Sequence, residues 1–294
     1  MLLNRKAVSN DQPTTIETIG TTRWVAYREH ADLLRELRVC GGEPWKSGAS
    51  SKLILAVRDK RACYAYTSPE TGRTYFIKVY RYQKISTRLR HIFRLSQGEK
   101  EWHQGTEAAR RGMRIPAYLA LGTRREGLKV HEDYCISEFR EGLMLPTDWL
   151  ADSSLLEKHG GREAFLHTFS QAFGAEVRRL HDVALYHREM KPGNLYLEES
   201  EDGLLSIGFL DGKHITVLSQ PSEKQRIINL LRTFRMWEPE MRKHALPRIC
   251  QKWFLEGYLG EASKGMAGQV WRDLARMLRA AGDSIRGPRE SSRR

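Results

Sequence analysis

A change of pattern midway along the chain constrains its fold more than any other feature of the sequence. The first half contains short runs of β-branched and aromatic residues bounded by turn-forming residues, which predict strands of an antiparallel sheet. The predicted strands are residues 52–57, 62–67, 74–80, 117–122 and 133–139. A helix is expected between the third and fourth strands, at about residues 97–111, because Gly112 and Pro116 follow it.

The second half is predicted to be mainly helical. Residues 163–183 place apolar side chains at steps of three and four, which gives a helix one continuous buried stripe. The stripe consists of Phe165, Phe169, Phe173, Val177 and Leu180. A small hairpin is expected over residues 194–211, and further helices from Pro221 to about Ala281. A sheet with one main helix, followed by a mostly helical half, predicts an α+β protein with two lobes.

The chain is expected to divide into four segments. These are an N-terminal extension (1–51), a sheet lobe (52–141), a helical lobe (142–281) and a disordered basic tail (282–294). Within the extension, residues 27–39 have helical spacing and end at a pair of glycines, so a helix is expected there.

The stretch YHREMKPGNLYL carries the most specific motif. Catalytic loops of phosphotransferases follow the pattern H-R-D-x-x-x-x-N, in which the Asp accepts the proton of the acceptor hydroxyl and the Asn holds magnesium. His187, Arg188 and Asn194 keep their places in this pattern, and Lys191 is where protein kinases carry a lysine that contacts the transferred phosphate. The preceding buried helix and the following hairpin are the context that such a loop requires.

Glu189 stands where the pattern has an aspartate. A glutamate is one methylene longer, so its carboxylate lies roughly 1.5 Å further from the backbone. Misplacement on that scale can cost ~100-fold in rate, although positioning and charge stabilisation supply much of the acceleration. We therefore expect an active enzyme whose rate the longer side chain can lower, and a degenerate kinase is the alternative.

Lys78 lies inside an apolar predicted strand, where burial of an unpaired ammonium is costly. In kinases such a lysine holds nucleotide phosphates and pairs with a carboxylate on the following helix. That helix offers Glu99, Glu101 and Glu107, and we favour Glu101 because the adjacent Trp102 would anchor that face in the core.

Asp211 and Gly212 follow the predicted hairpin, 22 residues after Glu189. A second magnesium ligand is expected at this place, and Asp211 is the candidate. Between the first two strands the phosphate-covering pattern G-x-G-x-x-G is absent. The basic residues of that turn, which are Arg58, Lys60 and Arg61, would then attract phosphate as point charges or serve only as solvated turn residues.

The formal net charge of +13 favours anionic partners. The densest basic stretch, residues 78–94, contains six Lys or Arg and no acid. A nucleic-acid partner is not favoured, because no aromatic platform for base stacking accompanies the charge. The four cysteines are scattered and the N-terminus lacks the apolar core of a signal peptide, so a cytoplasmic location is expected.

Together these features resemble the Kdo/WaaP lipopolysaccharide kinase family, from about Lys52 to Ala281. The resemblance rests on the lobe order, the missing glycine loop, the helix that begins GEKEW and leads to RRGMRIPAYLALG, and the short helical end. Only the catalytic loop is a sharp motif. The resemblance implies a bilobal protein-kinase-like fold, with an antiparallel sheet plus one main helix in the N-lobe and a mostly helical C-lobe. The loop is also similar to those of protein kinases and of aminoglycoside and choline phosphotransferases. Against an ordinary protein kinase, only 83 residues follow Asp211 and no A-P-E triplet is present.

The resemblance implies a phosphotransferase that depends on ATP and Mg²⁺ and has an alcohol group as acceptor. The acceptor would be a hydroxyl of a sugar, either heptose or Kdo, in the inner core of lipopolysaccharide. The resemblance implies that Lys78 and Glu101 bind the nucleotide. It implies that Asn194 and Asp211 bind magnesium, and that Glu189 and Lys191 are catalytic. The implied partners are the lipopolysaccharide core or another anionic glycolipid and the anionic inner membrane, with the protein peripheral on its cytoplasmic face. The alternatives are a pseudokinase that binds nucleotide or a partner, and a Ser/Thr protein kinase-like enzyme.

Overall fold

The computed structural model describes residues 14–46, 50–57, 60–260 and 276. These residues form two compact units. The first comprises residues up to 141 together with Asp211–His214, and the second comprises residues 142–210 and those from Ile215 onward. The predicted tail at 282–294 and the predicted helical region beyond residue 260 lie outside the described residues, apart from residue 276.

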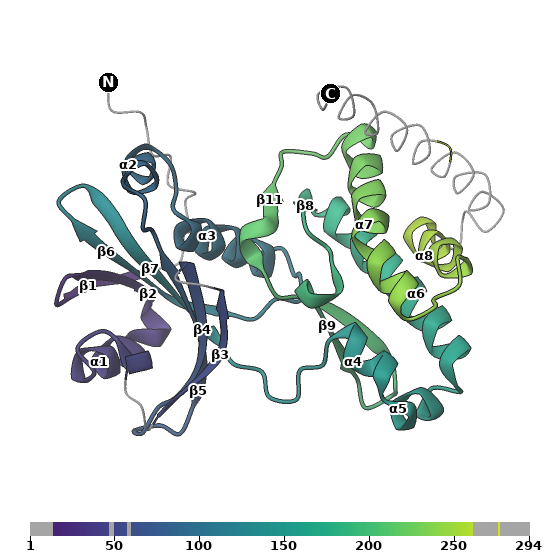
Figure 1. Cartoon of the computed structure of the whole chain (residues 1–294), viewed down its shortest axis with the longest axis horizontal. Helices are drawn as coiled ribbons and strands as arrows, with labels where there is room; N and C mark the ends of the chain where they lie inside the picture. The colour runs from purple at the N-terminus through teal and green to yellow at the C-terminus, as the bar shows by residue number, and fades with distance from the viewer. Residues whose placement is uncertain (1–13, 47–49, 58–59, 261–275, 277–294) are drawn as a thin grey trace, which may run out of the picture. The chain divides into compact units, whose positions relative to one another are not determined.

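The first unit is built on a seven-stranded antiparallel sheet with the order β1-β2-β6-β7-β5-β4-β3 (Figure 1). The strands are β1 (Thr14–Ile19), β2 (Thr22–Tyr27), β3 (Ser51–Val57), β4 (Arg61–Thr67), β5 (Thr74–Arg81), β6 (Tyr118–Glu126) and β7 (Lys129–Glu138). Its helices are α1 (Ala31–Val39), α2 (Ile85–Phe93) and α3 (Gln97–Arg110). The predicted antiparallel sheet and the helix at 97–111 are confirmed. Strands β1 and β2 and helix α2 were not predicted.

The two last strands are longer than predicted and form one hairpin. The charged residues between them continue both strands, and Arg124 on β6 pairs with Glu132 on β7 at 2.9 Å. The turn is closed by Gly127, whose φ of 56° lies in the left-handed region that glycine adopts without strain. The charged residues between the two predicted strands therefore belong to the strands and not to a loop.

The sheet separates two groups of side chains because successive residues on a strand point to opposite faces. On β5, Ile77 and Val79 are fully buried in a hydrophobic core that also contains Leu34 of α1 and Trp24 of β2. The intervening residue, Lys78, points to the other face. This alternation places a lysine in a strand that is otherwise embedded in the core.

Helix α3 begins with a capping box, in which the Ser96 hydroxyl accepts from the Glu99 amide and the Glu99 carboxylate accepts from the Ser96 amide. Beside this start, Asp133 of β7 is fully buried and accepts hydrogen bonds from the Tyr82 hydroxyl (2.6 Å) and the Gly98 amide (3.0 Å). The start of α3 is therefore fixed both within the helix and against the sheet.

The second unit is mainly helical, as predicted (Figure 1). Its helices are α4 (Pro146–Ala151), α5 (Ser153–Lys158), α6 (Arg162–Asp182), α7 (Glu223–Lys243) and α8 (Ile249–Leu259). A hairpin pairs β9 (Leu195–Glu199) with β10 (Leu205–Phe209), and β8 (Leu185–His187) pairs with β11 (Ile215–Val217) in a second two-stranded antiparallel sheet. The α+β fold class is confirmed.

The predicted apolar stripe of α6 forms the core of this unit. Phe173 packs edge to face with Phe254 of α8, and Phe169 contacts Trp237 of α7. Helices α6 and α8 approach so closely at Gly174 that a Cβ there would lie 1.9 Å from the Phe254 carbonyl oxygen. The glycine therefore permits the close packing of α6 against α8, which holds the C-terminal end of α6 and the loop that follows it.

In the described part of the chain, no helix is both long and apolar enough to cross a bilayer.

Candidate active site

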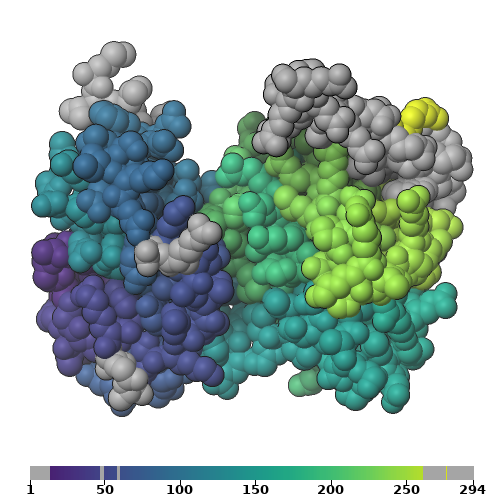
Figure 2. All heavy atoms as spheres, in the orientation of Figure 1, coloured from purple at the N-terminus to yellow at the C-terminus, as the bar shows by residue number. Residues whose placement is uncertain are grey.

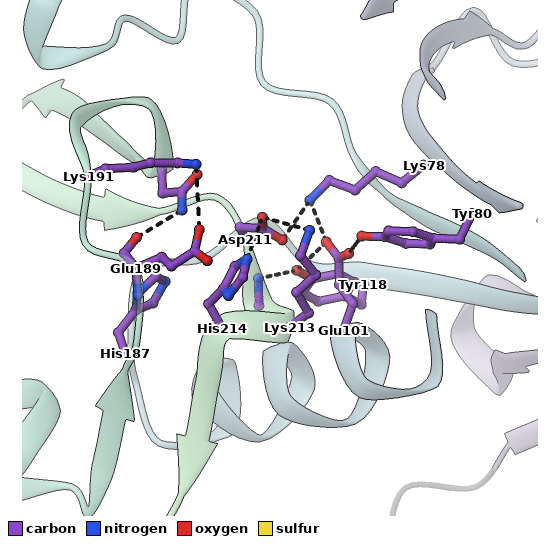
Figure 3. A network of polar contacts seen from close by, with 12 residues as sticks. Lys78, Tyr80, Glu101, Tyr118, His187, Glu189, Lys191, Asp211, Lys213 and His214 are labelled. Atoms are coloured by element: carbon purple, nitrogen blue, oxygen red, sulfur yellow. Dashed lines mark hydrogen bonds and ion pairs between the residues drawn. The ribbon is translucent and has the colours of Figure 1, made fainter. Parts of the chain in front are cut away.

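Lys78 of β5 and Glu101 of α3 form a buried ion pair in the first unit (Figure 3). The Lys78 Nζ lies 2.5 Å from Glu101 Oε1, and the two side chains are 11% and 1% exposed. Of the three candidate carboxylates, Glu101 is thus the partner of Lys78. Glu99 instead caps its own helix, and Glu107 binds Arg110 and Arg111 one turn further along.

Two tyrosines complete the environment of the Glu101 carboxylate. The Tyr80 hydroxyl donates to Glu101 Oε2, and the Tyr118 hydroxyl donates to Oε1 at 3.2 Å. Burial and the neighbouring Glu101 raise the pKa of both phenols well above the usual value, so both keep the proton that they donate. Both carboxylate oxygens therefore have donors, as a fully buried charge requires.

The segment Asp211–His214 belongs to the first unit although its sequence neighbours on both sides belong to the second. The Gly212 amide donates to the Tyr118 hydroxyl at 3.2 Å. A Cβ at Gly212 would lie 2.6 Å from that hydroxyl and 2.9 Å from the Gly105 Cα of α3. The Asp-Gly pair is therefore required for close backbone contact, which places the Asp211 carboxylate beside Lys78.

Asp211 Oδ1 lies 3.5 Å from the Lys78 ammonium, while Oδ2 lies 3.0 Å from Lys213 Nζ and 3.4 Å from His214 Nε2. Burial alone would raise the pKa of Asp211, but Lys78, His214 and Lys213 hold it well below the usual value. Burial alone would lower the pKa of Lys78, but Glu101 and Asp211 hold it above the usual value. Asp211 and Lys78 therefore both remain charged over the physiological pH range.

The same face of the sheet surrounds Lys78 with small side chains. Cys63 of β4 and Cys135 of β7 are directly opposite Lys78 on the two neighbouring strands, and both are buried. Burial raises the pKa of both thiols, so they are uncharged neighbours of the ammonium. Arg61, opposite Tyr80, lies on this face, whereas Arg58 lies outside the described residues.

The candidate catalytic loop of the second unit holds the backbone of Glu189 on both sides (Figure 3). The Glu189 amide donates to His187 Nδ1 at 3.2 Å, and the Glu189 carbonyl accepts from the Asn194 side chain at 2.8 Å. His187 itself is buried and stacks on Phe209 of β10 at a centroid distance of 5.3 Å. The side chain of Glu189 is 37% exposed and lies 3.5 Å from the Lys191 ammonium.

Helix α7 ties this loop in place on either side of Glu189. The Asn229 side chain donates to the His187 carbonyl at 2.7 Å, and the Trp237 indole donates to the Met190 carbonyl at 2.8 Å. Asn229 in turn is paired with His181 of α6 at 2.9 Å. Asn229 and His181 are both fully buried, and burial lowers the pKa of His181. The loop is thus positioned by α7 through hydrogen bonds to its backbone, and α6 supports Asn229 from behind through His181.

Sequence reasoning did not identify the residues that hold the candidate side chains. Tyr80 had a usable signal, because it lies two residues after Lys78 on the same strand and therefore on the same face. Tyr118 and Asn229 had none, because each reaches its partner only through tertiary packing. The supporting residues missed in this way are Tyr80, Tyr118, His181, Lys213, His214, Asn229 and Trp237.

The chemistry of the candidate ligands fits magnesium, which prefers carboxylate and amide oxygens. Asp211 supplies an ionised carboxylate in the first unit, and Asn194 supplies an amide in the second. The described residues contain no group of three or more His, Cys, Asp or Glu that could by itself hold a metal ion. Magnesium in such sites keeps few protein ligands and completes its shell with phosphate oxygens and water.

The chain is similar to one protein family and to solved structures of kinases. The model of the lipopolysaccharide kinase (Kdo/WaaP) family matches residues 57–258. The solved structure of WaaP in complex with acyl carrier protein is similar at 14% sequence identity and a TM-score of 0.59, over 90% of this chain and 99% of that chain. The crystal structure of the BubR1 kinase domain matches at 13% identity and a TM-score of 0.37, over 72% of this chain and 53% of that chain. No curated protein sequence matches.

Proposed function

The chain belongs to the lipopolysaccharide kinase (Kdo/WaaP) family, and from this premise we propose that it transfers phosphate from ATP to a sugar of the lipopolysaccharide inner core, either heptose or Kdo. Members of this family are phosphotransferases. What we propose for this chain is the identity of the nucleotide (ATP), of the metal ion (magnesium) and of the acceptor sugar.

The observation that carries the proposal is the buried Lys78–Glu101 pair beside Asp211. We assign the Lys78 ammonium to the nucleotide phosphates, because its raised pKa keeps it charged and Glu101 fixes its position. We assign Asp211, together with Asn194, to magnesium. When bound, magnesium would neutralise charge on the phosphate oxygens.

Glu189 is proposed to receive the proton of the acceptor hydroxyl. The acceptor oxygen forms a bond to the γ-phosphorus, the bond between that phosphorus and the bridging oxygen breaks, and ADP leaves. Lys191, 3.5 Å from Glu189, is proposed to contact the transferred phosphate. This ion pair must open during the reaction, because the carboxylate then faces the hydroxyl and the ammonium faces the phosphate.

Two observations favour a pseudokinase as the second candidate. Glu189 replaces the usual aspartate, and the Lys213 ammonium lies 3.0 Å from Asp211 Oδ2, where it competes with a metal cation for the carboxylate. A protein that bound nucleotide without metal would retain the Lys78–Glu101 pair and lose phosphate transfer.

A comparison of the wild type with Glu189→Ala separates the two candidates. Purified protein is incubated with lipopolysaccharide, ATP and magnesium, and the core glycan is examined by mass spectrometry for added phosphate. We expect the wild type to add one phosphate per acceptor, and Glu189→Ala to be slower by about 100-fold, the lower range for loss of a general base. If both proteins consume ATP equally slowly over lipopolysaccharide, the pseudokinase is correct.

We also propose two partners. The net charge of +13 suits the anionic surface of the inner membrane, where the lipid-linked acceptor would be found. The solved WaaP structure contains an acyl carrier protein, and we propose that a carrier protein be tested as a partner of this chain. Co-purification of the chain with such a protein would support this, and its absence from the purified chain would count against it.

A further inference from the structure

Helix α2 presents an unusual apolar stripe to solvent. Ile85, Leu89 and Phe93 are four residues apart, so they lie on one face of the helix. Their side chains are 63%, 42% and 84% exposed. Single exposed apolar residues are common on protein surfaces, whereas an aligned row of three marks an interaction surface. The atoms of α2 form part of the surface of the first unit in Figure 2.

The opposite face of α2 is fixed against the unit, so the exposure of the stripe is a consequence of packing. His91 is buried and lies against the Tyr82 ring at a centroid distance of 4.5 Å. The Arg88 guanidinium donates to the Tyr82 carbonyl at 2.5 Å. Rotation of the helix to bury Phe93 would withdraw His91 and Arg88 from these contacts.

Basic side chains border the apolar stripe. Lys84, Arg90 and Arg94 are exposed, and none of the three forms an ion pair with another residue in the part of the chain that the structure describes. Helix α2 contains no acidic residue. Helix α2 and its two cap residues therefore carry exposed apolar side chains together with exposed cations that no ion pair compensates within the described residues.

We propose that α2 is an interfacial membrane helix, which lies in the headgroup region of an anionic bilayer. Ile85, Leu89 and Phe93 enter the boundary with the acyl chains, and the neighbouring cations bind lipid phosphates. A Phe- and Leu-bearing face beside Arg and Lys is the pattern of helices that lie in this interface. The inference rests on the proposed function in one respect, because a glycolipid acceptor requires the enzyme to work at a membrane.

Vesicle flotation tests the apolar stripe. The double substitution Leu89→Ser and Phe93→Ser changes only exposed side chains, so the fold should be retained. We expect at least a tenfold loss of partitioning to vesicles of phosphatidylglycerol and phosphatidylethanolamine, because insertion of two apolar side chains is removed. Val39→Ser on α1 is the matched control, because Val39 is 78% exposed and α1 lies at the opposite end of the same unit (Figure 1).

Charge is tested separately. The substitutions Arg90→Gln and Arg94→Gln should each weaken binding to the anionic vesicles by about fivefold and should leave binding to phosphatidylcholine vesicles unchanged. Vesicle binding that is equal in the wild type and in the Leu89/Phe93 variant would overturn the inference. A wild type that ignores vesicles but is dimeric in light scattering, and is made monomeric by that variant, would also overturn it in favour of self-association.

The failure of the kinase proposal is distinguishable from the failure of this one. Each protein is assayed with lipopolysaccharide in vesicles and with the deacylated, water-soluble core oligosaccharide. The Leu89/Phe93 variant should lose at least tenfold in rate on the vesicle acceptor and retain the wild-type rate on the soluble one. If the wild type phosphorylates neither acceptor yet binds vesicles through α2, the kinase proposal fails and the membrane helix stands.

Discussion

The substitution Glu101→Gln tests the buried pair at the centre of the first unit. It keeps the size of the side chain and removes the charge that faces Lys78. Lys78 is 11% exposed, so its ammonium has little access to water. Loss of one partner from a buried pair costs about 3–5 kcal/mol, and Asp211, 3.5 Å from Lys78, retains part of the attraction. We therefore expect the free energy of unfolding of the first unit to fall by about 3 kcal/mol.

Glu107→Gln, on the same helix, is the matched control. Its carboxylate is 5% exposed, but its partners Arg110 and Arg111 are 67% and 23% exposed, so both guanidinium groups reach water when the pair is lost. We expect the control to lose less than about 1 kcal/mol. Urea unfolding at neutral pH, followed by tryptophan fluorescence, measures both variants. Equal losses would refute the reasoning, because they would mean that the Lys78 ammonium gains nothing from Glu101 beyond an ordinary surface pair.

Three further substitutions test neighbouring features. Burial raises the pKa of Asp133 to about 6. Between about pH 4 and 6, this carboxyl is therefore protonated in the folded state and ionised in the unfolded state. The free energy of unfolding of the wild type, relative to that of Asp133→Asn, should therefore be highest below about pH 4 and should fall by roughly 3 kcal/mol as the pH rises through 6. A difference in urea unfolding that does not depend on pH would contradict this. Asn229→Leu should lower kcat by about 100-fold, because a shift of about 1 Å in the catalytic loop has that cost, and it should leave ATP binding unchanged. Steady-state kinetics measures kcat and calorimetry measures ATP binding, and a variant that loses ATP binding would contradict the prediction. Gly212→Ala should weaken the binding of ATP with magnesium by at least about tenfold, because its Cβ would displace Asp211; a thermal shift equal to that of the wild type would contradict this.

Local patterns were sufficient where a strand or helix has one buried face. The period of two around Lys78 and the apolar stripe of α6 each correspond to a structural element with little change of boundary. Trp102 also marked the correct face of α3, since it is buried and stacks on Tyr27. The lobe order and the stretches that accompany the catalytic loop indicated the family, and the family model supports that identification.

The elements and contacts that were not predicted depend on tertiary packing. Strand β1 alternates exposed and half-buried residues along most of its length, and its partner is β2, so its sequence carries little apolar signal. Helix α2 was not predicted, because its apolar stripe faces solvent and its sequence is marked mainly by basic residues. Asn229 is 42 residues from His187, and no local spacing connects them. The boundaries of the predicted segments and the roles of the candidate site residues stay predictions.

The dependence of phosphate transfer on magnesium tests the central claim most directly. Mass spectrometry of the lipopolysaccharide core follows the transfer by the wild type and by Asp211→Asn over a range of magnesium concentrations. The account predicts one added phosphate by the wild type, and at least a tenfold higher magnesium requirement for the variant, since the ionised carboxylate is lost. A wild type that adds no phosphate at any magnesium concentration, or two proteins with the same magnesium dependence, would contradict it.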